Sequence, residues 1–169
     1  MASILNVDQI GHSTSGTTAL TIDSSGNVSA SGRIVTPARP AFRVYGTSNA
    51  WATISSNVKL NLLTTVDYNI GSHYSTTDHE FTAPVDGLYH FSGRLYVNNA
   101  ATISDFYISV DDAGFTANLY FASQDIDAAD SSVTFAETLQ LTANQTVSIK
   151  GNSGQYYPIY CSFNGYLVG

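Results

Sequence analysis

The chain has 169 residues, of which 43% are hydrophobic and only 11% are charged. Charged residues make up about 25% of an average globular domain, so Ser and Thr must supply much of the polar surface here. Six Lys and Arg residues stand against 13 Asp and Glu residues, which gives a net charge of −7. This balance argues against nucleic acid and against an anionic membrane surface as partners.

Signals for export, membrane insertion and cross-linking are not visible in the sequence. The first basic residue is Arg33, whereas a secretory signal starts with a basic region followed by an apolar run. No stretch approaches the roughly 20 apolar residues that span a bilayer. The one cysteine, Cys161, excludes an internal disulfide, and we expect it to pack as a small apolar side chain. We therefore expect a chain that is made in a reducing compartment or needs no cross-linking, and that does not insert into a membrane.

Residues 1–39 form a first unit that is poor in large apolar side chains. Leu20 and Ile22 alternate with polar residues, a turn follows over Asp23–Asn27, and Val28 comes next, which predicts a small β-hairpin. One hairpin is marginal alone in water, so this arm is expected to be disordered or to pair with other copies of the chain. Pro37 and Pro40 stiffen the connection to a second unit, residues 40–169.

Residues 40–169 show period-two alternation of apolar and polar side chains. The pattern is clearest over 88–97, where Tyr89 and Phe91 share one face and His90 and Arg94 share the other. Amphipathic helical spacing is absent, which predicts an all-β fold, an antiparallel jelly-roll sandwich. A hairpin turn is expected at Gly151–Gly154. The predicted strands are 41–45, 59–67, 88–97, 103–110, 115–121, 133–141, 146–150 and 159–168.

Glu137 breaks the alternation, because it falls on the apolar face of the strand predicted over 133–141. A bulge or a strand end that turns the side chain to solvent is the simpler interpretation. The alternative is a carboxylate buried at a subunit interface beside Arg94 or Lys150. The sequence leaves both open.

Four motifs, in order along residues 40–169, resemble the globular head of complement component C1q, a member of the tumour-necrosis-factor-like jelly rolls. The first is Asn69–Tyr74 followed by Phe81–Phe91, which reads Phe-Thr-Ala-Pro-Val-Asp-Gly-Leu-Tyr-His-Phe. The others are the opening Ala41-Phe42, the hairpin 139–147, and the closing strand Ser162-Phe-Asn-Gly-Tyr-Leu-Val168. The resemblance implies a compact homotrimer. The aromatic content of 12% agrees, because a small jelly roll buries only part of it and three-fold packing would bury the rest.

The opening Met-Ala-Ser-Ile-Leu-Asn-Val-Asp-Gln-Ile and the segment 19–32 resemble virion fibre proteins of bacteriophages, marine and cyanobacterial phages in particular. In those proteins a short N-terminal segment docks on other virion proteins and a trimeric head faces outward. The resemblance implies a virion protein that is assembled in the host cytoplasm. Its head would bind a host-surface glycan or protein; the alternative is a capsid or tail decoration protein that stabilises the particle. A secreted ligand of the complement type is less favoured, because neither a signal peptide nor a collagen repeat is visible.

Candidate receptor contacts lie on three loops, because Tyr and amide side chains at loop tips can stack on and hydrogen-bond sugars. The loops are Asp111–Phe115, Gln124–Asp130 and Asn152–Tyr157. The candidate receptor-contact residues in these loops are Asp111, Asp112, Phe115, Gln124, Asp125, Asp127, Asp130, Asn152, Tyr156 and Tyr157.

The sequence supports a catalytic or metal-binding function less well than a function as a binding module. His73, Asp78, His79 and Glu80 could be drawn as a metal site, but adjacent residues on extended chain point apart. No Gly-Xaa-Ser-Xaa-Gly elbow is present, and a small head leaves little room for a glycosidase cleft. Calcium is possible at the acidic loops, although their spacing fits no defined calcium loop and solvated loops are the preferred reading. We therefore expect no enzyme, no catalytic residue, no metal site and no cofactor.

Overall fold

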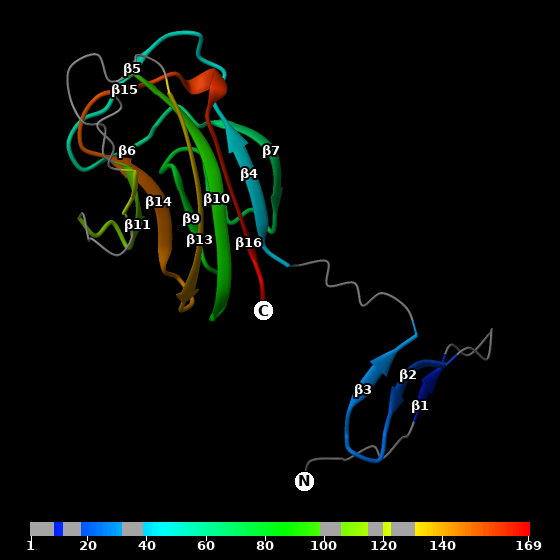
Figure 1. The fold of residues 1–169 in the computed structure, drawn as a ribbon. Coiled ribbons are helices and arrows are strands. Elements are labelled where there is room, and N and C mark those ends of the chain that lie inside the picture. The colour runs from blue at the N-terminus through cyan, green and yellow to red at the C-terminus, as the bar shows by residue number, and fades with distance from the viewer. Residues whose placement is uncertain (1–8, 12–17, 32–38, 99–105, 115–119, 123–130) are drawn as a thin grey trace. The chain divides into compact units, whose positions relative to one another are not determined.

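The computed structural model describes residues 9–11, 18–31, 39–98, 106–114, 120–122 and 131–169 (Figure 1). The chain divides into two compact units, Met1–Pro37 and Ala38–Gly169. The sequence places this division at residue 39.

The first unit contains a three-stranded antiparallel sheet of β1 (Gln9–Gly11), β2 (Thr18–Ile22) and β3 (Val28–Ala30). The β2–β3 pair is the predicted hairpin, and β1 adds a strand that the sequence did not indicate. Asp23 closes the turn, since its carboxylate accepts hydrogen bonds from the backbone N–H groups of Ser25 and Asn27. Gly26 takes a left-handed conformation at φ 83°.

The second unit is a sandwich of two antiparallel sheets, as predicted. The first is a seven-stranded sheet in which six strands follow the order β5-β15-β10-β16-β4-β7. The seventh strand, β13, also pairs with β10. Its strands are β4 (Ala41–Tyr45), β5 (Ala52–Thr53), β7 (Thr65–Ile70), β10 (Gly87–Asn98), β13 (Ser131–Leu141), β15 (Gln155–Tyr156) and β16 (Ser162–Leu167).

The second sheet has six strands, in the order β12-β11-β14-β9-β8, with β6 pairing with β14. Its strands are β6 (Val58–Lys59), β8 (Tyr74–Ser75), β9 (Glu80–Thr82), β11 (Phe106–Val110), β12 (Tyr120–Ala122) and β14 (Thr146–Gly151). The part of the chain that the structure describes contains one short 3-10 helix, η2 (Pro158–Tyr160), and no α-helix.

Aromatic rings fill the space between the two sheets. Phe42 is completely buried, stacks on Tyr74 at 4.8 Å and on Phe81 at 5.2 Å, and meets Phe163 edge-on at 5.0 Å. Phe91 packs on Phe163 at 6.0 Å. Such ring pairs add to the hydrophobic stabilisation of the core. Three of the four family-like motifs therefore converge on one cluster, because each of the three contributes at least one of these rings.

One predicted strand and one predicted turn are wrong where the chain crosses between the sheets. The apolar run 59–67 was expected to be one strand, but β6 pairs with β14 in the second sheet and β7 pairs with β4 in the first. Leu60 and Leu63 are buried in the crossing. The segment 151–154 likewise leads from β14 to β15, which belong to different sheets, so it is a crossing and not a hairpin turn.

The start of the predicted strand 159–168 is also different. Pro158 begins η2, and the N–H of Cys161 donates to the carbonyl of Pro158 at 2.8 Å to close the turn. The strand β16 then begins at Ser162. The short helix places Ile159 and Tyr160 on the surface, where both are more than two-fifths exposed.

Candidate assembly face and distal groove

The outer face of the seven-stranded sheet is built from alternate residues of its neighbouring strands. The register sets Arg94 beside Ser162 and Ser162 beside Tyr45, and two residues further on it sets Ser92, Asn164 and Arg43 in a second row. The inward residues of β10, among them Tyr89 and Leu95, are buried. The predicted alternation of β10 is thus confirmed, and His90 and Arg94 lie on the outer face.

Five large apolar side chains are exposed toward the end of this face at which β16 ends. They are between 38% and 46% exposed, whereas an equally large side chain in the core is nearly inaccessible. The strand register brings Ile70, Ala41, Tyr166 and His90 into one row, and the rings of His90 and Tyr166 lie 5.4 Å apart. We call the set the assembly patch; its members are Tyr68, Ile70, Leu88, Tyr166 and Val168. A contiguous group of this kind marks an interaction surface.

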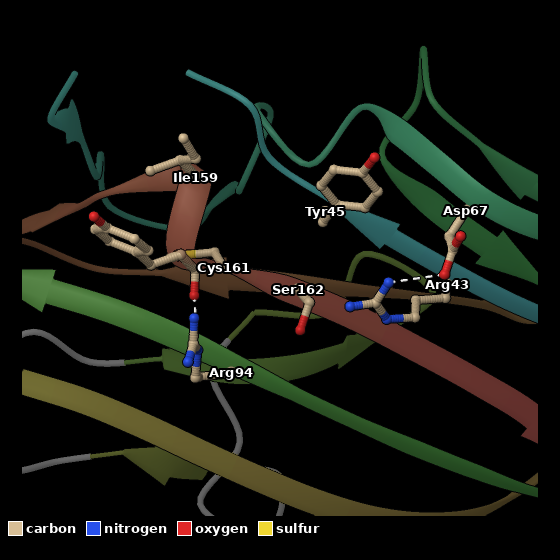
Figure 2. Close-up of a pocket in the computed structure, with 8 residues that line it drawn as sticks. Arg43, Tyr45, Asp67, Arg94, Ile159, Cys161 and Ser162 are labelled. Carbon is tan, nitrogen blue, oxygen red and sulfur yellow. Dashed lines mark hydrogen bonds and ion pairs between the residues drawn. The ribbon is translucent and has the colours of Figure 1, made fainter. Parts of the chain in front are cut away.

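The other end of the same face is hollowed into an open groove of about 510 Å³ (Figure 2). This end carries η2 and lies away from Pro40, whose carbonyl accepts the N–H of Leu167 at the opposite end. We call the hollow the distal groove. The residues that line it are Arg43, Tyr45, Asp67, Arg94, Ile159, Tyr160, Cys161 and Ser162.

Two arginines in the distal groove have different surroundings. Arg43 donates from Nη1 to Oδ2 of Asp67 at 2.8 Å, and its guanidinium lies 5.7 Å from the centre of the Tyr45 ring. Arg94 donates from Nε to the backbone carbonyl of Tyr160 at 2.9 Å. Figure 2 shows Ser162 between the two guanidinium groups. Among the described residues Arg94 has no acidic partner.

Four aromatic rings adjoin the distal groove. Trp51 stacks on Tyr96 at 5.9 Å and lies 4.9 Å from Tyr157, and Tyr160 stacks on Tyr157 at 5.5 Å and meets Tyr96 edge-on at 5.3 Å. Tyr160 is 49% exposed and the other three rings are half-buried. We call Trp51, Tyr96, Tyr157 and Tyr160 the distal aromatic cluster. Its rings offer both flat apolar surface and hydroxyl groups.

Cys161 forms the floor of the groove and is buried, as the sequence predicts. Its Sγ donates to the carbonyl of Tyr157 at 3.2 Å and accepts the backbone N–H of Tyr96 at 3.2 Å. Burial raises the pKa of the thiol to about 11. A neutral thiol at physiological pH is a packing and hydrogen-bonding group, and it is a poor nucleophile.

The second sheet carries a separate ionic cluster. Lys59 Nζ lies 2.7 Å from Glu80 Oε2 and 3.0 Å from Asp112 Oδ1, and Lys150 Nζ lies 3.4 Å from the same Asp112 oxygen. Desolvation of Asp112 opposes ionisation, but the hydrogen bonds and charges of Lys59 and Lys150 outweigh it and lower the carboxyl pKa. The Lys150 ammonium is nearly buried and also donates to the Asp112 carbonyl. The cluster fastens a turn to the sheet beneath it.

The predicted receptor residues fall into three groups. Asp111 and Asp112 lie on an exposed turn, but their carboxylates bind Gln145, Thr146 and the two lysines. Calcium binding at this turn stays a proposal. The carboxylate oxygens of Asp111 and Asp112 already interact with donor groups of the protein. Phe115, Gln124, Asp125, Asp127 and Asp130 lie outside the described residues.

The third group lies in the loop 152–157, and its residues differ in how deeply they are buried. Asn152 is half-buried, and Tyr157 is half-buried with its hydroxyl donating to Asn49 at 2.7 Å. Tyr156 is 1% exposed, and its hydroxyl accepts the N–H of Leu62, so its side chain belongs to the core and the expected receptor contact is wrong. The alternation of the short β15 explains the difference, because it turns Tyr156 inward.

The metal site considered at His73, Asp78, His79 and Glu80 is not assembled. Glu80 pairs with Lys59, Asp78 accepts the Ser75 hydroxyl at 2.7 Å, and Nδ1 of His79 is buried without a hydrogen-bond partner. Burial and the nearby Lys59 charge lower the His79 pKa. Across the described segments, no three His, Cys, Asp or Glu side chains gather as a metal would require.

Glu137 is half-buried in the middle of β13 and pairs with Phe91 in an unbroken register from Ser131 to Leu141. The bulge and strand-end interpretations are therefore wrong. Within one copy, Arg94 binds Tyr160 and Lys150 binds Asp112, so neither cation is bonded to Glu137. Its role at a subunit interface remains a hypothesis.

Arg94, Tyr160, Trp51 and Tyr96 were not among the predicted contact residues. The alternation placed Arg94 and Tyr96 on the outer face, which is the only signal that pointed to them. The surface position of Tyr160 follows from η2, and the proximity of Trp51 follows from the pairing of β5 with β15. No helix in the described segments is long and apolar enough to cross a bilayer.

Comparison with known proteins identifies the fold. The C1q domain family matches residues 41–168. The globular domain of zebrafish complement 1qA shares 18% identity at a TM-score of 0.59, and the alignment covers 78% of this chain and 98% of that one. Eiger TNF from S. frugiperda gives 13% identity, a TM-score of 0.59 and coverage of 78% and 94%. Murine APRIL gives 11% identity, a TM-score of 0.53 and coverage of 77% and 99%. No curated protein matches the sequence. The predicted jelly-roll class is confirmed, and trimers are typical of this family.

Proposed function

Because this chain belongs to the C1q domain family, we propose that it forms a homotrimeric head that carries a recognition surface on a bacteriophage fibre or appendage. Residues 1–39 would dock on other virion proteins, and the head would contact a host-surface glycan or protein. The protein would act in the virion after assembly in the host cytoplasm. No catalytic step is part of this proposal.

The assembly patch is the observation that carries the proposal. Its side chains Tyr68 and Ile70 on the edge strand β7 and Tyr166 on β16 are all more than two-fifths exposed. Burial of such a side chain against a neighbour contributes on the order of 1 kcal/mol, since part of its surface is already covered. A second and third copy of the same chain are the occupants that the family relationship favours.

The first unit supports the same assembly. Its strand β3 is exposed along its whole length, and Val28 is 61% exposed. A three-stranded sheet with so little cover gains stability when further strands or other copies pack on it. The sequence resemblance of this arm to phage fibre proteins supports a docking role.

Two measurements test the proposal. Light scattering of the full chain should give three times the monomer mass of 18.0 kDa. Fluorescently labelled full chain should bind cells of a susceptible bacterial strain and be displaced by excess unlabelled chain. A monomer in solution contradicts the trimeric head. A trimer that binds no cells, but labels intact capsids or tails at constant stoichiometry, would instead support the decoration role.

A further inference from the structure

We propose that Glu137 of one copy forms an ion pair with Arg94 of the neighbouring copy, so that the β13 edge of each subunit packs into the distal groove of the next. This inference rests on the proposed homotrimer, because it names the surfaces and the charged residues through which the copies meet. The distal groove is then filled by protein in the assembled head. The pair also gives a role to the one charge that breaks the alternation of β13.

A three-fold ring is closed by contacts between two different surfaces of each chain. The assembly patch and the distal groove both lie on the outer face of the seven-stranded sheet. Ile159 and Tyr160, which line the groove, are 43% and 49% exposed, and they continue the exposed apolar surface of the assembly patch to the other end of this face. The whole outer face therefore qualifies as one contact surface, and the second surface lies elsewhere on the chain.

The free edge of β13 fits the second surface. β13 pairs with β10 on one side, and among the described residues no strand pairs with its other side (Figure 1). The strand is 11 residues long, keeps an unbroken register and contains neither Pro nor Gly. An edge of this length presents unpaired backbone groups, which proteins cover or protect with charge. Val133 and Leu139 on this strand are half-buried, and a neighbour on the edge would cover them further.

Glu137 is the charge in the middle of that edge. It lies opposite Phe91 on the inward side of β13 and is half-buried. Among the described residues it has no bonded donor, whereas the other acidic residues described in the second unit each bind a donor of their own copy. A neighbour that covers the edge removes water from this carboxylate, which then requires a cation. The acidic residues with partners are Asp67, Asp78, Glu80, Asp86, Asp111 and Asp112.

Arg94 can supply that cation. Its Nε donates to the Tyr160 carbonyl at 2.9 Å, which orients the guanidinium, and it has no acidic partner among the described residues. Open space lies beside it in the distal groove and in a second hollow of about 270 Å³, lined by Arg94, Tyr96, Ser132 and Tyr160. A planar guanidinium binds a carboxylate through two parallel hydrogen bonds.

The two residues of one copy point to opposite faces of the sheet. Arg94 lies opposite Thr134 on the outer face, whereas Glu137 lies opposite the buried Phe91. Successive side chains of a strand alternate between the faces, and positions 134 and 137 of β13 are three residues apart. An ion pair between Arg94 and Glu137 therefore joins two copies.

The other described cations fit less well. Arg43 already binds Asp67 at 2.8 Å, and the two lysines belong to the ionic cluster of the second sheet. Arg39 donates to the Val168 carbonyl at the opposite end of the face, and it lines neither hollow. Arg94 is therefore the cation that is both oriented and open to an acid from outside.

Charge reversal in the full chain tests the pair. Glu137→Arg and Arg94→Glu each place like charges at the contact, and each should raise the concentration at which half of the trimer dissociates about tenfold or more. The double variant restores opposite charges and should return this concentration to within about threefold of the wild-type value. Analytical ultracentrifugation over a dilution series measures it. Asp78→Arg makes the same change of charge on an exposed turn of the second sheet and should leave the trimer unchanged.

Cross-linking locates the contact independently of its strength. The full chain with Arg94→Cys and Glu137→Cys is treated with a short bismaleimide and run on a denaturing gel. Covalent dimers and trimers should form, because only positions of different copies can be joined. Each single variant, and Arg94→Cys combined with Asp78→Cys, should stay at the monomer mass of 18.0 kDa. Cys161 is buried and should not contribute.

Three results overturn the inference and leave the proposed homotrimer standing. The first is a trimer that neither charge reversal weakens. The second is a double charge reversal that does not recover the trimer, which would show that Arg94 and Glu137 do not face each other. The third is a double-cysteine variant that is trimeric in solution but yields only monomer after cross-linking. A wild-type chain that is monomeric would instead remove the proposed trimeric head itself.

Discussion

The Cα atom of Gly165 lies against the ring of Phe91, so that a Cβ at position 165 would approach Cδ1 of that ring to 2.5 Å. The same Cβ would come 2.8 Å from the ring of Phe42. The strand register explains this crowding, since Gly165 on β16 pairs with Phe91 on β10 and with Phe42 on β4. The glycine of the closing motif is therefore the space into which two core rings pack.

Gly165→Ala should destabilise the head by about 1–3 kcal/mol, because the added methyl group overpacks a dense aromatic core. Urea unfolding measures the change. Gly114→Ala is the matched control, since among the described residues a Cβ there would meet nothing closer than 3.9 Å. A midpoint shift of equal size in both variants would contradict the packing argument.

The double variant Tyr166→Ser with Ile70→Ser should shift the trimer toward monomer, because it removes two neighbouring apolar members of the assembly patch. Light scattering across a dilution series measures the effect. Val58→Ser changes a residue of similar exposure, 49%, on the other sheet and should leave the mass unchanged. An unaltered trimer in the double variant would place the subunit contact elsewhere.

Cys161 should resist thiol reagents in the folded protein. Burial raises its pKa to about 11, so almost none of the reactive thiolate is present at pH 8. Titration with Ellman's reagent should release one equivalent of product per chain in urea and very little without it. Rapid reaction of the native protein would show that the groove floor opens to solvent.

The Asp112 cluster should make stability depend on pH at both extremes. The folded pKa of Asp112 lies below the ordinary value of 3.8, so its contribution is present above that value and lost as the pH falls through the folded pKa. The folded pKa of Lys59 lies above 10.5: desolvation opposes the charge, but Glu80 and Asp112 outweigh it. Its contribution is present below 10.5 and is lost as the pH rises through the folded pKa.

Asp112→Asn should therefore lower the urea midpoint near neutral pH and flatten its decline below about pH 4. Asp67→Asn alters a pair whose side chains are 42% and 52% exposed, where little stabilisation is expected. If both variants change the urea midpoint equally, the contacts of Asp112 with Lys59 and Lys150 stabilise the fold no more than the exposed pair of Arg43 and Asp67.

Tyr156→Phe should cost about 1–3 kcal/mol, because it leaves the N–H of Leu62 without its acceptor in a partly buried position. Tyr157→Phe removes a hydroxyl that bonds Asn49 near the surface and should cost less. Thermal unfolding of the two variants compares them. A larger loss of stability in Tyr157→Phe than in Tyr156→Phe would contradict the buried position of the Tyr156 hydroxyl.

Local sequence determined the class of the fold. Alternation along 88–97 specified a strand with Tyr89 and Phe91 inward and Arg94 outward, since successive side chains of a strand point to opposite faces. The Asp23–Asn27 turn was equally readable, because an Asx side chain followed by Gly bonds its own backbone. The motifs around Phe81 and Phe163 specified the family, because their rings must meet in one core.

Only the tertiary structure decided which exposed residues stand together. Arg94 and Tyr160 are 66 positions apart and meet because β10 pairs with β16 immediately after η2. The run 59–67 was misjudged because its leucines are buried by a crossing between sheets, which produces the same apolar pattern as a strand. Period two reports which face a side chain takes, but not which distant strand lies beside it, and that pairing creates both the assembly patch and the distal groove.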